Sequence, residues 1–211
     1  MIMKNYRKFF LTFFVLFMVS RSSHAQEDSL LMGIEETPGQ LLPERMGFVK
    51  RAFWGEHGVM RSLKISPLTP EGRQKELRVR RTMLKMHQFL GIATVAGMGV
   101  SLYFGQKIKS GHYEYIDEMD TFGTLSSGLY GTTALLQLLS PPPLIIRKST
   151  GWSSIRVHKT LAYLHFSGIV ATAITGISLA KEGDYTKMTP HQVSAYFTTA
   201  TLAGAMIVMT F

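Results

Sequence analysis

Long stretches without a charged side chain are the feature of this sequence that most restricts its fold. They lie within residues 84–106, 121–141, 157–180 and 191–211 and consist of apolar residues with Ser, Thr, Gln, Gly and His. A helix needs about 20 predominantly apolar residues to cross a hydrocarbon core of roughly 30 Å. A soluble helical bundle would instead need polar faces at helical spacing. We therefore predict an all-α integral membrane protein in which residues 81–211 form a four-helix bundle.

The charge of the chain is segregated from these stretches. Lys and Arg number 23 against 14 Asp and Glu, a formal charge of +9, although 45% of the residues are hydrophobic. A basic balance is typical of partners such as nucleic acid or anionic lipid, and beside membrane spans we expect the lipid bilayer and no nucleic acid. The sequence has no cysteine, which excludes disulfides, thiolate metal sites and C-x-x-C-H attachment of haem.

The N-terminus has the three regions of a secretory signal peptide. A cationic start precedes an apolar run over residues 9–20, and Ser23 and Ala25 form an A-x-A-like site. We predict that residues 1–25 are a signal peptide cleaved after Ala25; an uncleaved anchor helix is the alternative. With the membrane spans, this signal predicts location in a bacterial inner membrane.

Residues 26–80 are polar and interrupted by prolines, and they are too short to form a core of their own. We expect an extramembrane arm that is largely irregular or forms interfacial helices. Aromatic residues such as Trp54 are interleaved with cations, a pattern typical of a segment on a membrane surface; packing on the chain's own bundle explains it equally well. Thr69 followed by Pro70 is typical of a helix start.

The sidedness of the membrane domain is predicted differently by two rules. A cleaved signal peptide places residues 26–80 outside the membrane. The same side collects most of the Lys and Arg residues, which the positive-inside rule places in the cytoplasm. The two rules contradict each other, so the sequence leaves the sidedness open.

Four of the seven histidines lie in or at the ends of the predicted spans: His87, His158, His165 and His191. Ionisable groups in a membrane are costly and by default functional. The first and third spans run in the same direction, so His87 and His158 lie at matching depth near one membrane face. Two imidazoles from facing helices can bind the iron of a b-type haem from both sides. Small residues one turn later, such as Gly91, mark helix contacts or leave room for a flat ligand.

The other two histidines have alternative explanations. His165 follows His158 by seven residues, so both share one helix face about 10 Å apart along the axis. It is either the ligand of a deeper haem or a hydrogen-bonding partner for Ser or Thr. His191 opens the fourth span at the opposite membrane face, where helix capping or an interfacial position explains it without a ligand.

The motifs at three of these histidines resemble the cytochrome b561 family of membrane electron carriers. His87 begins His-Gln-Phe-Leu-Gly, His158 begins His-Lys-Thr-Leu-Ala and His191 begins His-Gln-Val-Ser-Ala. The resemblance covers roughly residues 80–211. It implies a haem b between the first and third helices, with His87 and His158 as axial ligands. It also implies a second haem between the second and fourth helices, for which His191 matches one half and the other half is missing.

The resemblance implies a transmembrane oxidoreductase or electron carrier, with a quinone or a small reductant as donor or acceptor. Lys85 and Arg156 precede the paired histidines and would stabilise haem propionates or an anionic donor; interfacial snorkelling explains them equally well. A second class of protein stays open. This is a haem-free membrane scaffold or assembly protein that uses its arm and basic flank to hold a partner.

Overall fold

The computed structural model describes residues 41–144 and 152–210, so the predicted signal peptide lies outside the described residues. Within them the chain is helical and has no β-strand, which confirms the all-α prediction. The elements are α3 (Phe48–Trp54), α4 (Val59–Ser62), α5 (Pro70–Lys109), η2 (Tyr113–Tyr115), α6 (Ile116–Leu139), α7 (Ser154–Glu182), η3 (Tyr185–Lys187) and α8 (Thr189–Thr210).

Helix α5 is an unbroken rod of 40 residues. At 1.5 Å per residue it is about 60 Å long, roughly twice the thickness of a hydrocarbon core. The predicted start is confirmed, because the Thr69 side chain accepts a hydrogen bond from the Gly72 N–H at 3.1 Å and Pro70 occupies the first turn. The first turns of α5 therefore extend beyond any membrane that its apolar part crosses.

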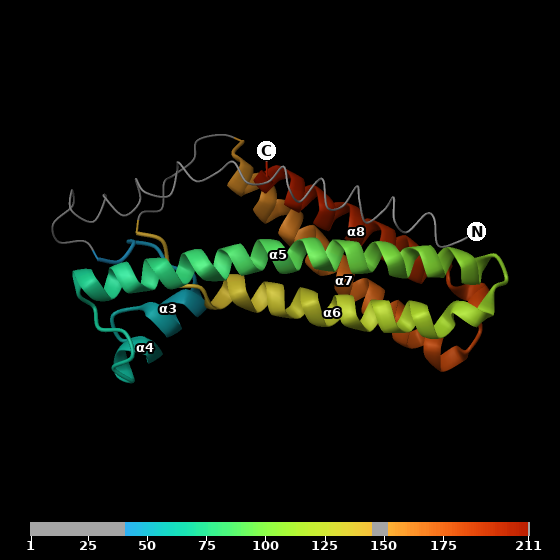
Figure 1. Ribbon diagram of the computed structural model, residues 1–211, viewed down its shortest axis with the longest axis horizontal. Coiled ribbons are helices and arrows are strands. Elements are labelled where there is room, and N and C mark those ends of the chain that lie inside the picture. The colour runs from blue at the N-terminus through green and yellow to red at the C-terminus, as the bar shows by residue number, and fades with distance from the viewer. Residues whose placement is uncertain (1–40, 145–151, 211) are drawn as a thin grey trace.

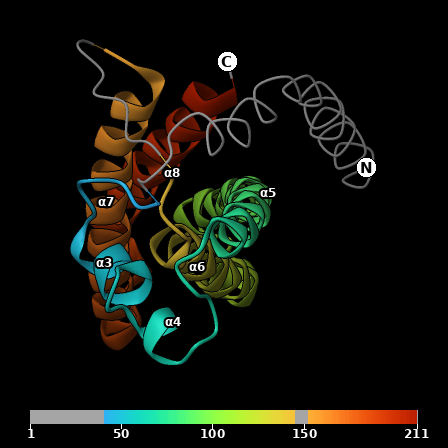
Figure 2. The ribbon, with the colours of Figure 1, turned by 90° about the vertical axis from the view of Figure 1, so that its left-hand side faces the viewer.

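The four long helices form two antiparallel hairpins, α5 with α6 and α7 with α8 (Figure 1). The hairpins meet where α5 contacts α8, whereas α6 and α7 are not closely packed against each other. Seen along the long axis, the two hairpins lie side by side, with α3 and α4 at the near end (Figure 2). Within the second hairpin the backbones approach closely at Gly168, where a Cβ atom would lie 2.5 Å from Thr198 Oγ1.

Three helices, α5, α7 and α8, are long and apolar enough to cross a membrane. Helix α6 has 24 residues and packs along α5, but its many Ser, Thr and Gly residues leave it below that level of apolarity. The predicted span over residues 121–141, and with it the bundle of four spans, is therefore not confirmed. Large apolar side chains are exposed along most of α7, which is typical of a helix surrounded by lipid. These three helices indicate a membrane protein in contact with a bilayer.

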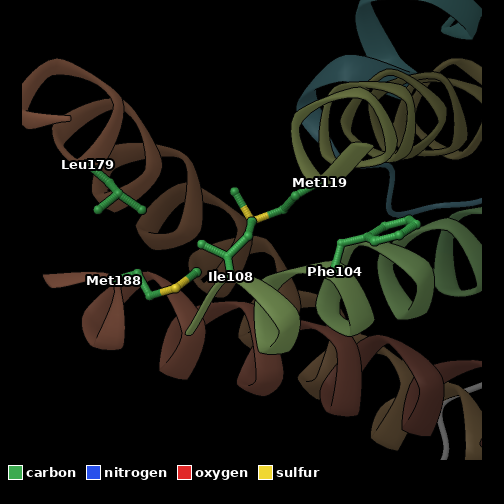
Figure 3. Close-up of a cluster of buried hydrophobic side chains, with 5 residues drawn as sticks. All are labelled: Phe104, Ile108, Met119, Leu179 and Met188. Carbon is green, nitrogen blue, oxygen red and sulfur yellow. The ribbon is translucent and has the colours of Figure 1, made fainter. Parts of the chain in front are cut away.

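An apolar cluster joins the hairpins at the end away from α3 and α4 (Figure 3). Its buried members are Phe104, Ile108, Met119, Leu179 and Met188. They come from α5, α6, α7 and the turn before α8, so side chains of both hairpins meet there (Figure 3). Between this cluster and the arm lies the part of the bundle that contains most of the predicted site residues.

From residue 41 onward the arm contains the short helices α3 and α4, and it packs on the chain's own bundle, one of the two alternatives predicted for it. Its centre is a polar cluster in which Arg73 is fully buried and Glu76 is 2% exposed. The Glu76 carboxylate forms ion pairs with Arg61 and Arg73 and accepts a hydrogen bond from the Ser66 hydroxyl. Apolar periodicity could not reveal this core, because its members are charged or polar.

Side chains of the arm and of the first turns of α5 cap the C-terminus of α6. Three prolines follow Ser140 and prevent the helix from continuing. Side chains donate to the carbonyls there: Trp54 to Leu139 at 2.9 Å, Lys50 to Ser140 at 2.9 Å and Arg80 to Pro141 at 2.7 Å. Carbonyls at a helix C-terminus lack intrahelical partners and carry partial negative charge, so donors and cations are stabilising there. We call these contacts, with the Glu76 cluster, the α6 clamp.

Candidate cofactor site

His87 of α5 and His158 of α7 lie next to each other where the two hairpins meet. Their ring centroids are 6.4 Å apart and the ring planes are inclined by 76°. Both rings are half-buried. The structure thus brings together the two residues that the sequence predicts as a ligand pair, although they are far apart in the chain.

Both imidazoles are held through the same ring nitrogen. Nδ1 of His87 lies 2.9 Å from the carbonyl oxygen of Thr133 in α6, and Nδ1 of His158 lies 3.0 Å from that of Ala205 in α8. A carbonyl oxygen can only accept, so Nδ1 carries the proton and Nε2 of the neutral ring keeps its lone pair. Metal-binding histidines typically donate their second N–H in this way, which fixes the tautomer and the ring orientation. The arrangement leaves Nε2 of both rings ready for a ligand.

The separation of the rings is compatible with two imidazole ligands of one metal ion. An imidazole nitrogen binds a metal at about 2 Å, so two such rings have centroids about 6 Å apart. The observed distance is 6.4 Å. Over residues 41–144 and 152–210, no group of three or more His, Asp or Glu residues could hold a metal ion. Haem requires only axial ligands from the protein, because the porphyrin supplies the remaining nitrogens.

Three further predicted site residues lie close to the pair along the chain. Gly91, one turn after His87, is buried, and a Cβ atom there would lie 2.9 Å from the sulfur of Met206 in α8. The glycine therefore accommodates a helix contact, and the flexible Met206 side chain is the group that must move to admit a flat ligand there. Lys85 and Arg156, each two residues before a paired histidine, have exposed side chains.

His165 lies further along α7 and contacts Tyr130 of α6. The Tyr130 hydroxyl is 3.0 Å from Nδ1 of His165, and the two rings are perpendicular. This hydrogen bond joins the two hairpins. The partner is a tyrosine, whereas the sequence favoured Ser or Thr as the alternative to a haem. When the hydroxyl donates, the ring proton of neutral His165 is on Nε2, where it prevents metal binding.

His191 lies in the first turn of α8, away from the paired histidines as predicted. Its Nδ1 is 3.0 Å from the carbonyl oxygen of Thr172 in α7, and its ring packs against Gly176. Ala205, the partner of His158, is 14 residues further along α8, or about 21 Å. His191 therefore does not join the His87 pair, and its bond to a neighbouring helix goes beyond the predicted capping role.

No protein-family model, no curated protein and no solved structure matches this chain.

Proposed function

We propose that this protein is a membrane electron carrier that binds a b-type haem between α5 and α7, with His87 and His158 as axial ligands. One observation supports the proposal above all others. The two rings lie 6.4 Å apart, and Nδ1 of each is bonded to a main-chain carbonyl. A haem held by two histidines supplies one-electron chemistry, in which iron alternates between the ferric and ferrous states.

Each hairpin supplies one ligand together with the carbonyl that orients it. Thr133 of α6 orients His87 of α5, and Ala205 of α8 orients His158 of α7. These bonds fix the tautomers and make both Nε2 atoms more basic. The two halves are thus built alike, and the site is complete only when the hairpins are docked.

The surrounding residues have roles in the same proposal. The long, exposed side chains of Lys85 and Arg156 would hold the propionates at the membrane surface through charge-assisted hydrogen bonds. Helix α6, which packs along α5, crosses the membrane together with α5, α7 and α8, and the domain sits in a bacterial inner membrane after removal of the signal peptide. A quinone or a small reductant exchanges electrons with the site.

The experiment that tests this function is a reduced-minus-oxidised visible spectrum of the protein, expressed with haem supply and purified in detergent. We expect a Soret band and a split α-band typical of low-spin haem. His87→Ala and His158→Ala should each abolish them. His112→Ala is the matched control, because His112 is 53% exposed and bonded to Glu114 outside the site.

A rescue experiment separates loss of a ligand from loss of the fold. His158→Gly leaves a gap that free imidazole can fill, so added imidazole should restore the low-spin spectrum to this variant and leave the wild type unchanged. A folded wild-type protein that shows no Soret band after haem supply would overturn the proposal. That result would favour the haem-free scaffold.

A further inference from the structure

A separate cavity lies towards the opposite end of the bundle from His87 and His158. Its volume is about 350 Å³, within the range typical of small-molecule sites. All four long helices contribute to its walls. It forms here because α6 and α7, on different hairpins, are not closely packed against each other.

Most of the cavity wall is made of small or apolar residues. Gly105, Gly123 and Gly176 come from three different helices, and Ala173 and Ala195 add further small side chains. A Cβ atom at Gly123 would meet only the Ser101 hydroxyl, at 3.5 Å, which is an ordinary contact distance. A wall of this kind fits the apolar body of a lipophilic molecule.

The polar end of the cavity presents hydrogen-bond acceptors. His191 donates its Nδ1 proton to the Thr172 carbonyl, so in the neutral form of the ring Nε2 offers a lone pair. Asp120 of α6 also lines the cavity and interacts electrostatically with His191. The buried Gln192 donates one amide N–H to the Gly105 carbonyl at 3.1 Å, which leaves its amide oxygen and its second N–H.

The hydroxyl groups of the cavity wall add further hydrogen-bond acceptors. Five of them donate to main-chain carbonyls and so offer only lone pairs to the cavity: Ser101, Ser126, Ser127, Thr172 and Thr199. The hydroxyls of Thr124 and Tyr185, which also line the cavity, can donate or accept. A ligand head with donors would pair with these lone pairs, whereas a head without donors would cover them with nothing to bond to.

We propose that this cavity binds a lipophilic molecule whose polar head donates hydrogen bonds to Asp120 and His191. The shared chemistry is a donor-rich head, either a phenolic hydroxyl or an ammonium group, on an apolar body. The site is separate from the haem site proposed above and does not require it.

The test uses the full chain in lipid nanodiscs and three radiolabelled probes. Dodecylhydroquinone and dodecylamine carry donor heads, and the dimethyl ether of the hydroquinone keeps the shape without a donor. We expect at least one donor-headed probe to bind about tenfold or more tightly than the ether, the loss typical of an unsatisfied buried acceptor. The stronger of the two donor probes identifies the type of head.

Two leucine variants of α6 test the location. Gly123→Leu fills the cavity and should weaken binding of the preferred probe about tenfold or more. Gly128→Leu is the matched control, because no atom lies within 4 Å of a Cβ at Gly128, and it should leave binding unchanged. Ala173→Leu, from the α7 wall, provides the same test if Gly123→Leu does not fold.

His87→Ala separates this inference from the proposed haem. Probe binding should persist in that variant whether or not the wild type contains haem. Equal binding of the ether and the donor-headed probes would overturn the inference. Unchanged binding in folded Gly123→Leu and Ala173→Leu proteins would also overturn it.

Discussion

The indole N–H of Trp54 donates a hydrogen bond of 2.9 Å to the main-chain carbonyl of Leu139, 85 positions further along the chain. Trp54 ends α3, and Leu139 is the last residue of α6. The bond therefore joins the arm to the end of a bundle helix. Since Trp54 is only 7% exposed, this contact belongs to the packed interior of the α6 clamp.

Removal of this hydrogen bond should lower the stability of the protein. Trp54→Phe keeps an aromatic ring but leaves the Leu139 carbonyl without its donor, so we expect a loss of about 1–3 kcal/mol. Thermal unfolding in detergent measures the effect. Trp152→Phe is the control, because Trp152 is 90% exposed at the start of the second hairpin, and its melting temperature should match the wild type.

The Glu76 carboxylate should be essential for the fold of the arm. Glu76→Gln removes the charge that pairs with Arg61 and the fully buried Arg73, and breaking a buried ion pair from one side typically costs about 3–5 kcal/mol. We expect faster proteolysis within residues 41–69 and a lower melting temperature. The exposed Glu56→Gln carries the same change of charge and should behave as the wild type. Equal stability of the two variants would contradict this role of Glu76.

Lys50 should give the clamp a pH dependence. Burial, and secondly the positive charge of Arg80, lower the pKa of the Lys50 ammonium to about 8 from its usual 10.5. Between these pH values the unfolded chain binds a proton that the folded chain does not, so Lys50 makes stability rise with pH through that window. NMR titration of isotopically labelled methyl-lysines should show one resonance with a midpoint near 8, which Lys50→Met removes. A midpoint close to the usual 10.5 would contradict this prediction.

Two glycines in the long helices should respond oppositely to alanine. A Cβ atom at Gly168 would lie 2.5 Å from Thr198 Oγ1 and 3.3 Å from Thr198 Cα, so Gly168→Ala should force α7 and α8 apart. Overpacking of this kind typically costs about 1–3 kcal/mol. Gly128→Ala meets nothing within 4 Å and should stabilise α6 by about 0.5–1 kcal/mol, because glycine weakens a helix interior. Chemical denaturation of the two variants in detergent measures both changes.

Local signals made part of the fold predictable. The start of α5 follows from Thr69 and Pro70, and the prolines after Ser140 limit α6. The absence of charged residues predicted membrane spans less reliably. The 121–141 stretch has no charged residue, yet its hydroxyls and glycines make α6 less apolar than the other long helices.

The pairing of His87 with His158 was predictable because helices that run in the same direction place equivalent positions at equal depth. The hydrogen bonds of these histidines to the carbonyls of Thr133 and Ala205 were not predictable. Every residue has a main-chain carbonyl, so the residue type does not indicate which carbonyl accepts the bond. The contact between Tyr130 and His165 depends on how the hairpins dock, which short sequence patterns do not specify. The burial of Glu76 was also not predicted. A Glu among Arg and Lys residues gives the same sequence pattern when it lies on a helix face exposed to solvent.

The length of α5 has a mechanical consequence. Glu76, held by the clamp, and His87 are eleven residues apart on this one rod, which is about three full turns and about 16 Å along the axis. Their side chains therefore leave the rod at nearly the same azimuth. The ion pairs of Glu76 fix the rotation of α5 about its own axis, and this rotation sets the direction in which the His87 imidazole points. Any event that turns the arm end of α5 also changes the angle at which His87 meets His158.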